Sequence, residues 1–446
     1  MNKTTTFVFV LAACISATAL AQTKDSADEN SLITYKIKAG DTFNQFAQKY
    51  LQQPVDLNEI YKVNAIRSID LLPVGAELNI PRHLLKQRAS KATVMSLSCN
   101  APIWQQGSST KALAIGSVVT EGAVIEVPAE CHVSLLLEDG SVIRLPSSAS
   151  LKITTLRKNS LEPAPEVRLD LTKGRVELDV QKGRAKSTPF EVRTPISIMG
   201  VRGTEFRVGY SPDDQAGQVE VLGGVVQTRG RADSKASALT GGLGVPIDAN
   251  GKALAIEKLL APPQFESAVA TSGNNPSFVA KLTPVQFASH YVADNANTAN
   301  LTGNRSSQNL LAPELFIPRV TRQATFYQLS SVSESGLIGS ERQYAFCAPA
   351  TDKPKRCSAI FDAPLADEAP IAFTLSQETG GATHTLVNTQ NLQAKNGRFA
   401  IQGLPIGHYK WTLSYVLPQT SDAVGNPTVI KQSGTFELII LSAHTP

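Results

Sequence analysis

The chain has few charged side chains and no long basic or apolar run. Of its 446 residues, 18% are charged, against roughly 25% in typical soluble domains, and the net charge is only +4. No run of Lys or Arg could bind a phosphate backbone by releasing counterions, so the composition argues against nucleic-acid binding. After the N-terminal segment, no stretch reaches the ~18 apolar residues of a membrane helix, which predicts a mature chain without a transmembrane span.

Catalytic and metal-binding motifs are also missing. The 6 His residues are scattered, with no HExxH motif and no Cys–His order typical of a peptidoglycan endopeptidase. The glycine-rich stretch Gly241–Gly244 lacks the strand, loop and helix of a phosphate site. We therefore expect no enzyme activity, no cofactor and no metal. A pair of carboxylates that hydrolyses glycosidic bonds is the catalytic alternative that one sequence leaves open.

The N-terminus has the pattern of a secretory signal peptide. Lys3 precedes an apolar stretch over residues 7–15, and Ala19-Leu20-Ala21 supplies the small residues of a cleavage site. This pattern predicts a signal peptide over residues 1–21 and export of the mature protein from the cytoplasm. The alternative is a lipoprotein anchored at Cys14, because the residues before this cysteine resemble a bacterial lipobox.

The four cysteines beyond Cys14 predict disulfides. An even number of cysteines in an oxidising compartment favours disulfides over catalytic thiols or zinc ligands. Four cysteines allow three pairings, and the sequence alone leaves the choice open. Closeness along the chain favours two short loops, which join Cys99 to Cys131 and Cys347 to Cys357.

The length predicts about three domains, and the first is a small α+β module over residues 33–82. Tyr35–Lys38 alternates apolar and charged residues as a half-buried strand does. Thr42 and Gln45 match a capping box that opens a helix, and a second helix is predicted to open at Asp56. An alternating strand over residues 77–80 completes the order strand, helix, helix, strand.

These residues resemble the lysin motif (LysM) along its whole length, through Gly40-Asp41-Thr42, Asn64 and the segment from Leu71 to Pro81. The resemblance implies a shallow, non-catalytic groove that binds N-acetylglucosamine-containing glycans between two loops. A role in a turn and helix cap alone is the alternative for the first loop. The expected glycan-binding residues are Gly40, Asp41, Thr42 and Phe43 in the first loop and Ala65, Ile66, Ile69, Asp70, Leu71 and Leu72 in the second.

Residues 96–248 predict an all-β domain, because short alternating strands are separated by turn residues. Asp139-Gly140 and Lys173-Gly174 are each predicted to turn a hairpin. The order of strands resembles the FecR domain, most specifically at Val201-Arg202-Gly203-Thr204-Glu205-Phe206. FecR proteins proper span the inner membrane and signal to a sigma factor. We find no such segments here, so the resemblance implies a periplasmic β-domain suited to protein contacts.

Within that motif, the apolar flanks Val201 and Phe206 are expected in the core. Arg202 and Glu205 are expected to form a stabilising pair at the glycine-flanked turn, and contact with a partner is the alternative. The rest of the chain is predicted to be β-rich. Residues 249–348 form a linker and a β domain, and residues 358–443 resemble a fibronectin-type-III-like β-sandwich.

The fold expected from the sequence is multidomain and mainly β. The whole chain resembles bacterial secreted LysM-FecR domain proteins, which implies a non-catalytic periplasmic protein that binds peptidoglycan and tethers β-rich interaction domains to it. The alternative is an envelope signalling or assembly component whose FecR-like domain recognises a membrane protein. The expected partners are therefore peptidoglycan and an envelope protein.

Overall fold

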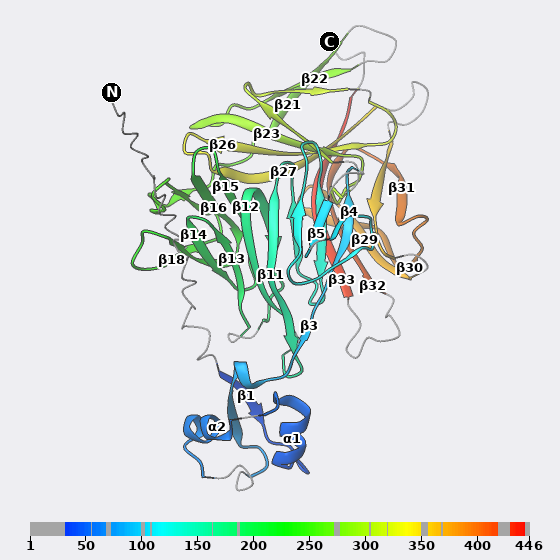
Figure 1. The fold of residues 1–446 in the computed structure, drawn as a ribbon. Helices are drawn as coiled ribbons and strands as arrows, with labels where there is room; N and C mark the ends of the chain where they lie inside the picture. Colours follow the sequence, from blue (N-terminus) through cyan, green and yellow to red (C-terminus); the bar gives the residue numbers. More distant parts are fainter. Residues whose placement is uncertain are drawn as a thin grey trace, which may run out of the picture. The chain divides into compact units, whose positions relative to one another are not determined.

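The computed structural model describes most of the chain (Figure 1). It forms two compact units, Met1–Lys86 and Gln87–Pro446. The predicted signal peptide and Cys14 lie outside the described residues. No helix in the described part is both long and apolar enough to cross a membrane. The described residues are 32–54, 56–67, 73–99, 103–107, 109–162, 164–184, 188–271, 277–302, 305–318, 320–348, 356–366, 369–417 and 429–441.

The first unit has the predicted order of strand, helix, helix and strand. The helices are α1 (Phe43–Tyr50) and α2 (Leu57–Asn64), and a 3-10 turn (Arg82–Leu84) follows the second strand. Strands β1 (Leu32–Lys36) and β2 (Glu77–Pro81) pair antiparallel from Leu32 opposite Pro81 to Lys36 opposite Glu77. Apolar side chains from all four elements form its core: Ile33, Tyr35, Phe46, Ala47, Leu51, Ile60, Leu78, Ile80 and Leu85.

Eighteen strands of the second unit, β3 to β20, close on themselves around one apolar core. These strands form two layers, and long strands such as β12 belong to both of them. The first part of β12, Val167–Asp170, pairs with β13 in one layer, and Gly174–Asp179 pairs with β15 in the other. The strands are β3 (Gln87–Ala89), β4 (Ala92–Leu97), β5 (Ile103–Gln106), β6 (Ser109–Ala112), β7 (Val118–Val119), β8 (Val124–Glu126), β9 (Val133–Leu137), β10 (Val142–Leu145), β11 (Ser150–Asn159), β12 (Glu166–Asp179), β13 (Phe190–Thr194), β14 (Ser197–Val201), β15 (Glu205–Ser211), β16 (Ala216–Gly223), β17 (Val225–Gly230), β18 (Ser237–Thr240), β19 (Leu243–Ile247) and β20 (Glu257–Lys258).

One of the two predicted hairpin turns in this part is wrong. Asp139-Gly140 turns the chain between β9 and β10, as expected, with Gly140 at a φ of 84°. Lys173-Gly174 instead lies inside the continuous strand β12. A Cβ on Gly174 would lie 2.5 Å from the carbonyl oxygen of Ser148, and its φ is 79°. Glycine therefore lets the strand pass close to its neighbour where it leaves one layer for the other.

The remaining strands form an eight-stranded sheet in the order β24-β23-β26-β27-β33-β32-β29-β30, with smaller sheets β21-β22-β25 and β28-β31 beside it. Strands from 249–348 and from 358–443 share the large sheet, so no sheet boundary separates the two predicted segments. The strands are β21 (Phe265–Ala270), β22 (Phe278–Leu282), β23 (Ala288–Ala296), β24 (Ser306–Leu310), β25 (Glu314–Ile317), β26 (Thr325–Ser333), β27 (Ile338–Cys347), β28 (Cys357–Asp362), β29 (Ile371–Thr379), β30 (Ala382–Leu392), β31 (Arg398–Leu404), β32 (Gly407–Val416) and β33 (Val429–Ile440).

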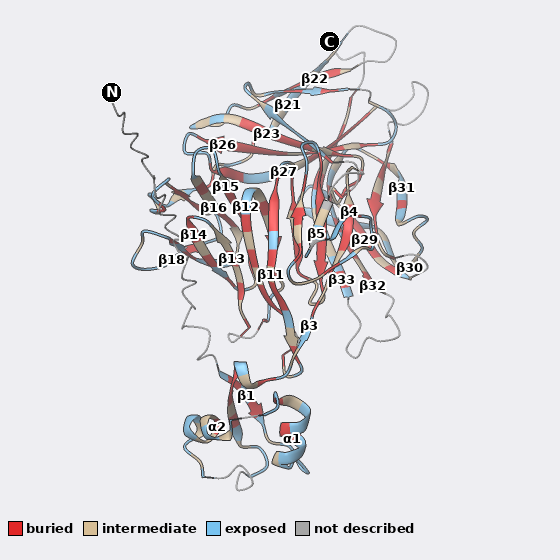
Figure 2. Cartoon of the chain, in the orientation of Figure 1, coloured by how far each residue is buried: buried red, intermediate tan, exposed pale blue. Residues whose placement is uncertain are grey.

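The C-terminal core joins side chains of the eight-stranded sheet and of the β28-β31 pair to Met95, Leu136 and Val142 of the preceding strands. Buried residues alternate with more exposed ones along β32, one of the strands of the large sheet (Figure 2). Phe361 of β28 contacts Phe373 and Trp411 edge to face, with ring centroids 4.8 and 5.5 Å apart. Such aromatic pairs stabilise a core beyond the area that they bury. The second layer of this predicted sandwich therefore consists of two strands, and aromatic side chains fill the space between the layers.

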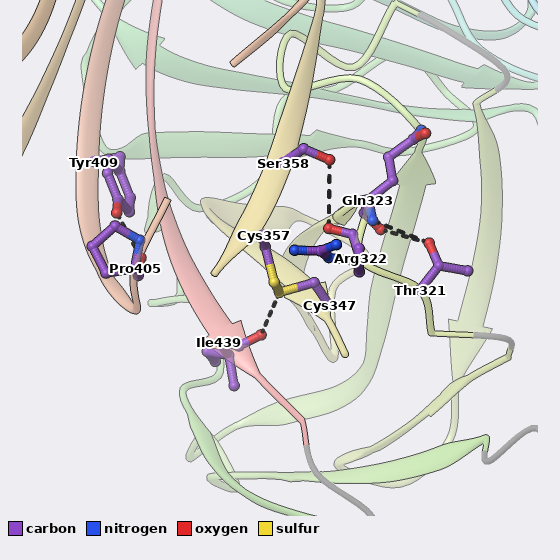
Figure 3. The surroundings of a disulfide bond; sticks show 9 residues. All are labelled: Thr321, Arg322, Gln323, Cys347, Cys357, Ser358, Pro405, Tyr409 and Ile439. Carbon is purple, nitrogen blue, oxygen red and sulfur yellow. Dashed lines mark hydrogen bonds between the residues drawn. A yellow bond between two sulfur atoms is a disulfide. The ribbon is translucent and has the colours of Figure 1, made fainter. Parts of the chain in front are cut away.

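Both expected disulfides are present. Cys99 and Cys131 have Cα atoms 5.4 Å apart, and Cys347 and Cys357 have Cα atoms 6.3 Å apart. Figure 3 shows the second bond joining the end of β27 to the start of β28, with the Cys347 sulfur 3.8 Å from the carbonyl oxygen of Ile439. This bond therefore links the large sheet to its two-stranded cover.

Candidate functional site

The first predicted groove loop begins where β1 ends, beside the start of β2. Because these strands are antiparallel, the end of β1 lies beside the start of β2, where Lys36 is opposite Glu77. The pairing continues past the strands, since the N–H of Ile37 donates to the Ala76 oxygen at 2.9 Å and that of Gly75 donates to the Ile37 oxygen at 2.8 Å. Along the chain, the first loop follows β1, and the second loop precedes the turn at Gly75 and Ala76 that leads into β2.

The first loop is held by Asp41. Its carboxylate accepts hydrogen bonds of 2.8 Å from the N–H of Lys38 and from the hydroxyl of Tyr35. The Lys38 N–H and then the Tyr35 hydroxyl lower the pKa of Asp41. Burial, followed by the Asp41 carboxylate, raises the pKa of Tyr35 to about 12. Asp41 is therefore ionised and Tyr35 is a neutral donor at physiological pH, so the loop shape is fixed before any ligand arrives.

Thr42 caps α1 as the sequence predicts. Its hydroxyl accepts from the N–H of Gln45 at 3.4 Å, and its φ of −115° is the extended conformation of an N-cap residue. Asp56 caps α2 in the same way, through a 3.0 Å bond from the N–H of Asn58. The turn-and-cap role of the first loop is thus observed. It does not exclude ligand binding, because Asp41 and Thr42 are both exposed.

Asn64 ties the second loop to the sheet. Its amide nitrogen donates to the carbonyl oxygens of Ile60 and Asn79 at 2.8 and 2.7 Å, and its amide oxygen accepts from the N–H of Asn79 at 2.7 Å. The sequence marked this residue as part of the LysM resemblance, without these bonds. These bonds pair the N–H and C=O groups of Asn79 in β2, and they thereby position the start of the second loop. The helix then ends as Ala65 adopts a left-handed φ of 50°.

The structure describes six of the ten predicted glycan-binding residues. Short backbone-rich loops of this kind offer N–H and C=O groups to acetamido and hydroxyl groups. Gly40, Asp41, Thr42 and Ala65 are exposed, Phe43 and Ile66 are half-buried, and Ile69, Asp70, Leu71 and Leu72 lie outside the described residues.

A second polar region lies on the outer face of the β12–β15–β16 layer, where the C-terminal strands cover it. Arg207 of β15 is fully buried and donates to the carbonyl oxygens of Ile338 and Gly339 at 3.2 and 3.1 Å, and it pairs with Glu341. Glu220 of β16 accepts from the N–H of Ile338 at 3.1 Å. At this place, charged side chains form the contact between the β12–β15–β16 layer and the C-terminal strands, where an apolar contact would be usual. No periodic pattern in the sequence predicted this network.

The same network contains a buried histidine. The Nε2 of His132 lies 3.3 Å from the Ser134 hydroxyl. Burial, and then the charge of Arg305, lowers the pKa of His132 to about 3, so the imidazole is neutral at physiological pH. Burial also opposes ionisation of Glu177, yet Arg305 and the neighbouring arginines outweigh it and lower the pKa of that carboxyl. Arg305 pairs with two carboxylates: it donates to Asp294 at 2.7 Å and lies 3.6 Å from Glu177.

The expected pair between Arg202 and Glu205 is not formed in the described part of the chain. Arg202 donates from Nε to the carbonyl oxygen of Arg184 at 3.1 Å. Glu205 lies opposite Asp179 in the β12–β15 ladder, and burial and this like charge both raise its pKa. The flanks Val201 and Phe206 are buried as expected. The two polar residues separate because Arg202 lies in the turn between β14 and β15, whereas Glu205 begins β15 opposite Asp179.

The described residues offer few arrangements of side chains for metal binding or catalysis. No group of three or more His, Cys, Asp and Glu side chains among them is arranged to hold a metal ion. His132 and Ser134 lie within hydrogen-bond distance, but both are buried. A substrate could not reach that hydroxyl without opening the interface.

Comparisons with known proteins identify two domains. The LysM domain model matches residues 35–81, and the FecR protein model matches residues 123–227. Two crystal structures of a protein described as an anti-sigma factor from Parabacteroides distasonis are 21% identical to the chain, with TM-scores of 0.26 and 0.25. They cover 30% of this chain, which spans 59% of theirs. No curated protein matches it. The chain therefore carries a LysM domain followed by a FecR domain, the order that its sequence predicts.

Proposed function

We propose that this protein is a non-catalytic, periplasmic peptidoglycan-binding protein. In this proposal the LysM groove binds N-acetylglucosamine-containing glycan and tethers the FecR and C-terminal strands to the cell wall. The observation that carries it is the LysM match over residues 35–81, together with a first loop that follows β1 and is fixed by Asp41. The disulfides support an extracytoplasmic location, because such bonds persist in oxidising compartments.

The proposed contacts are those of the predicted loops, Gly40–Phe43 and Ala65–Leu72. Asp41 and Tyr35 fix the first loop, so this loop needs little ordering on binding, and Asn64 fixes the start of the second. A shallow groove buries little of a sugar. One module should therefore bind weakly, and firm attachment would need several modules acting together.

Co-sedimentation of the mature chain with purified sacculi tests the proposal. We expect the full chain to pellet and a chain lacking residues 32–86 to stay in the supernatant. Ile69→Asp, in the second loop, should reduce pelleting. Val63→Asp, on an exposed part of α2, is the matched control and should not. Equal pelleting of all four proteins, or of none at low salt, would overturn the proposed function.

Maturation by release, with Gln22 as the N-terminus, belongs to the same proposal. The small residues Ala19-Leu20-Ala21 support cleavage at this point. Mass spectrometry of the N-terminal peptide should find Gln22. A diacylglyceryl group on Cys14 would instead show the lipoprotein alternative and place the protein on a membrane.

A second candidate is an envelope signalling or assembly component, in which the FecR domain recognises a membrane protein. The FecR match over residues 123–227 favours it. The two candidates differ in what holds the protein in the envelope. Binding of the chain lacking residues 32–86 to membranes free of peptidoglycan would favour the second, and loss of all envelope binding would favour the first.

A further inference from the structure

Strands β27 and β33 are neighbours in the large sheet but pair over only part of their length. They run parallel, and Tyr344–Cys347 pairs with Glu437–Ile440. Before that point, β33 pairs with β32 along its other edge from Val429 onward. Its edge toward β27 has no backbone partner within the described residues. The sheet is therefore split, with a strand edge open on each side.

Alternation along the strands identifies the open backbone groups. The N–H of Leu441 donates to the Cys347 oxygen, so alternate residues of β33 turn their N–H and C=O toward β27. These include Lys431, Ser433 and Thr435. On β27, the same bond turns the C=O of Cys347 toward β33, and alternation along the strand places the N–H and C=O of Gln343 and Glu341 there too.

Side-chain bonds hold the split open. Gln343 of β27 donates to the carbonyl oxygen of Ala299 at 2.7 Å, and Asn300 donates to the side-chain oxygen of Gln432 of β33 at 2.8 Å. Asn300 is itself fixed by Asp362, whose N–H donates to it at 3.0 Å. The two strands cannot close on each other without breaking these bonds, so the opening belongs to the folded structure.

The split forms a cavity of about 690 Å³, here called the β27–β33 cleft. It is lined by consecutive residues, 341–343 of β27 and 430–437 of β33. Because side chains of a strand alternate between faces, consecutive lining residues mean that the strand edges themselves face the cavity. Its volume falls within the range of roughly 300–1,000 Å³ for ligand sites.

Two carboxylates lie on the FecR side of the cleft. Asp179 and Glu205 both line it and lie directly opposite each other in the β12–β15 ladder. Neither forms an ion pair within the described residues, although Arg144 lies near enough to favour ionisation of Glu205. Like charges in opposite positions destabilise a sheet. A cation placed between them would relieve that repulsion.

We propose that the β27–β33 cleft accepts an extended peptide segment of a partner protein as an added strand, with a Lys or Arg side chain of that segment between Asp179 and Glu205. The open groups alternate at the spacing of a strand, which a polypeptide backbone matches and a glycan or lipid does not. The partner's main chain supplies affinity and its basic side chain supplies register. This site goes beyond the glycan groove and does not depend on it.

The probe is a library of seven-residue peptides with a central lysine and randomised flanking positions, titrated against the full mature chain. Hydrogen exchange should show new protection at Lys431, Ser433 and Thr435 and at Glu341 and Gln343. A bound peptide resynthesised with alternate backbone nitrogens methylated should lose binding, because it cannot donate to the strand edges. Replacing its lysine by glutamate should weaken binding by at least about tenfold.

The protein variant is Asp179→Asn with Glu205→Gln, and the matched control is Glu266→Gln, an exposed carboxylate on β21. The double variant should weaken the lysine peptide about tenfold and the control should leave it unchanged. Absence of any binding peptide, equal binding after N-methylation, or protection outside the cleft would overturn the proposal. Sacculus binding, measured separately on the same proteins, shows whether the glycan function stands.

Discussion

Arg207 of β15 pairs with Glu341 of β27, although 134 residues separate them in the sequence. The same guanidinium donates to the carbonyl oxygens of Ile338 and Gly339. A single buried side chain therefore joins the FecR strands to the C-terminal sheet. The arrangement explains why residues 87–446 form one compact unit although the sequence suggests several domains.

The first prediction is that Arg207→Met destabilises this unit by about 3–5 kcal/mol, the usual effect of removing one partner from a buried charge network. The substitution leaves Glu220 and Glu177 without the nearby charge that favours their ionised forms. Urea unfolding of the full chain, followed by intrinsic fluorescence, measures the change. We also expect the unfolding of the FecR and C-terminal strands to separate into two transitions.

Arg229→Met is the matched control, since Arg229 is exposed on β17. Its effect should stay within about 0.5 kcal/mol. If the two variants were equally stable, the network would contribute nothing to the interface beyond its packing.

The second prediction concerns pH. The pKa of His132 is about 3 in the folded chain and near 6.5 when unfolded. Between these values the unfolded chain binds a proton that the folded chain does not, so stability is complete above pH ~6.5 and falls as the pH is lowered. The contribution approaches about 1.4 kcal/mol per pH unit below pH ~6. Urea unfolding at pH 7.5, 6.0 and 5.0 measures the slope.

His132→Asn removes this titration while keeping a polar side chain near Ser134. The variant should therefore lose less stability than the native chain between pH 6.0 and 5.0. The carboxylates of the network titrate in both proteins and cancel in the comparison. Identical slopes would show that His132 is not held neutral by its surroundings.

Local signals in the sequence were enough for the LysM unit. A cap at Thr42, a turn at Gly75 and two alternating strands each act over a few residues, and they agree with one another. The hairpin at Asp139-Gly140 was readable for the same reason. Gly174 misled the prediction, because a glycine with positive φ inside a bending strand looks the same in sequence as one in a hairpin.

Long-range relationships could not be read from the sequence. The parallel pairing of β27 with β33 joins segments about ninety residues apart, and nothing local specifies it. The buried ion network is equally hidden, because charged residues in a strand look solvent-exposed until a second layer covers them. In the glycan groove, the sequence named the loop residues but missed the structural role of Asn64, whose bonds depend on the final position of Asn79.

The third prediction is that Asn64→Ala destabilises the LysM unit by about 2–3 kcal/mol, because it leaves the N–H and C=O of Asn79 without partners. Hydrogen exchange of the full chain should show faster exchange of the α2 amides, with no change beyond residue 87. Asn58→Ala is the control, since that side chain is exposed on the same helix. Equal exchange in both variants would contradict a clamping role.

The last prediction compares the two disulfides. Cys99 and Cys131 close a loop with a sequence separation of 32, whereas Cys347 and Cys357 are separated by 10. If restriction of the unfolded chain dominates, the longer loop stabilises by roughly 4 kcal/mol and the shorter by roughly 3. Each bond can be isolated by removing the other.

Reduction of the Cys347→Ala, Cys357→Ala variant opens only the longer loop, and reduction of the Cys99→Ala, Cys131→Ala variant opens only the shorter one. Each comparison keeps the protein's side chains constant, so the lost packing of the replaced cysteines cancels. We expect urea unfolding to show a loss about 1 kcal/mol larger for the longer loop. The opposite order would mean that the native surroundings of Cys347 and Cys357, both buried in the C-terminal core, outweigh loop length.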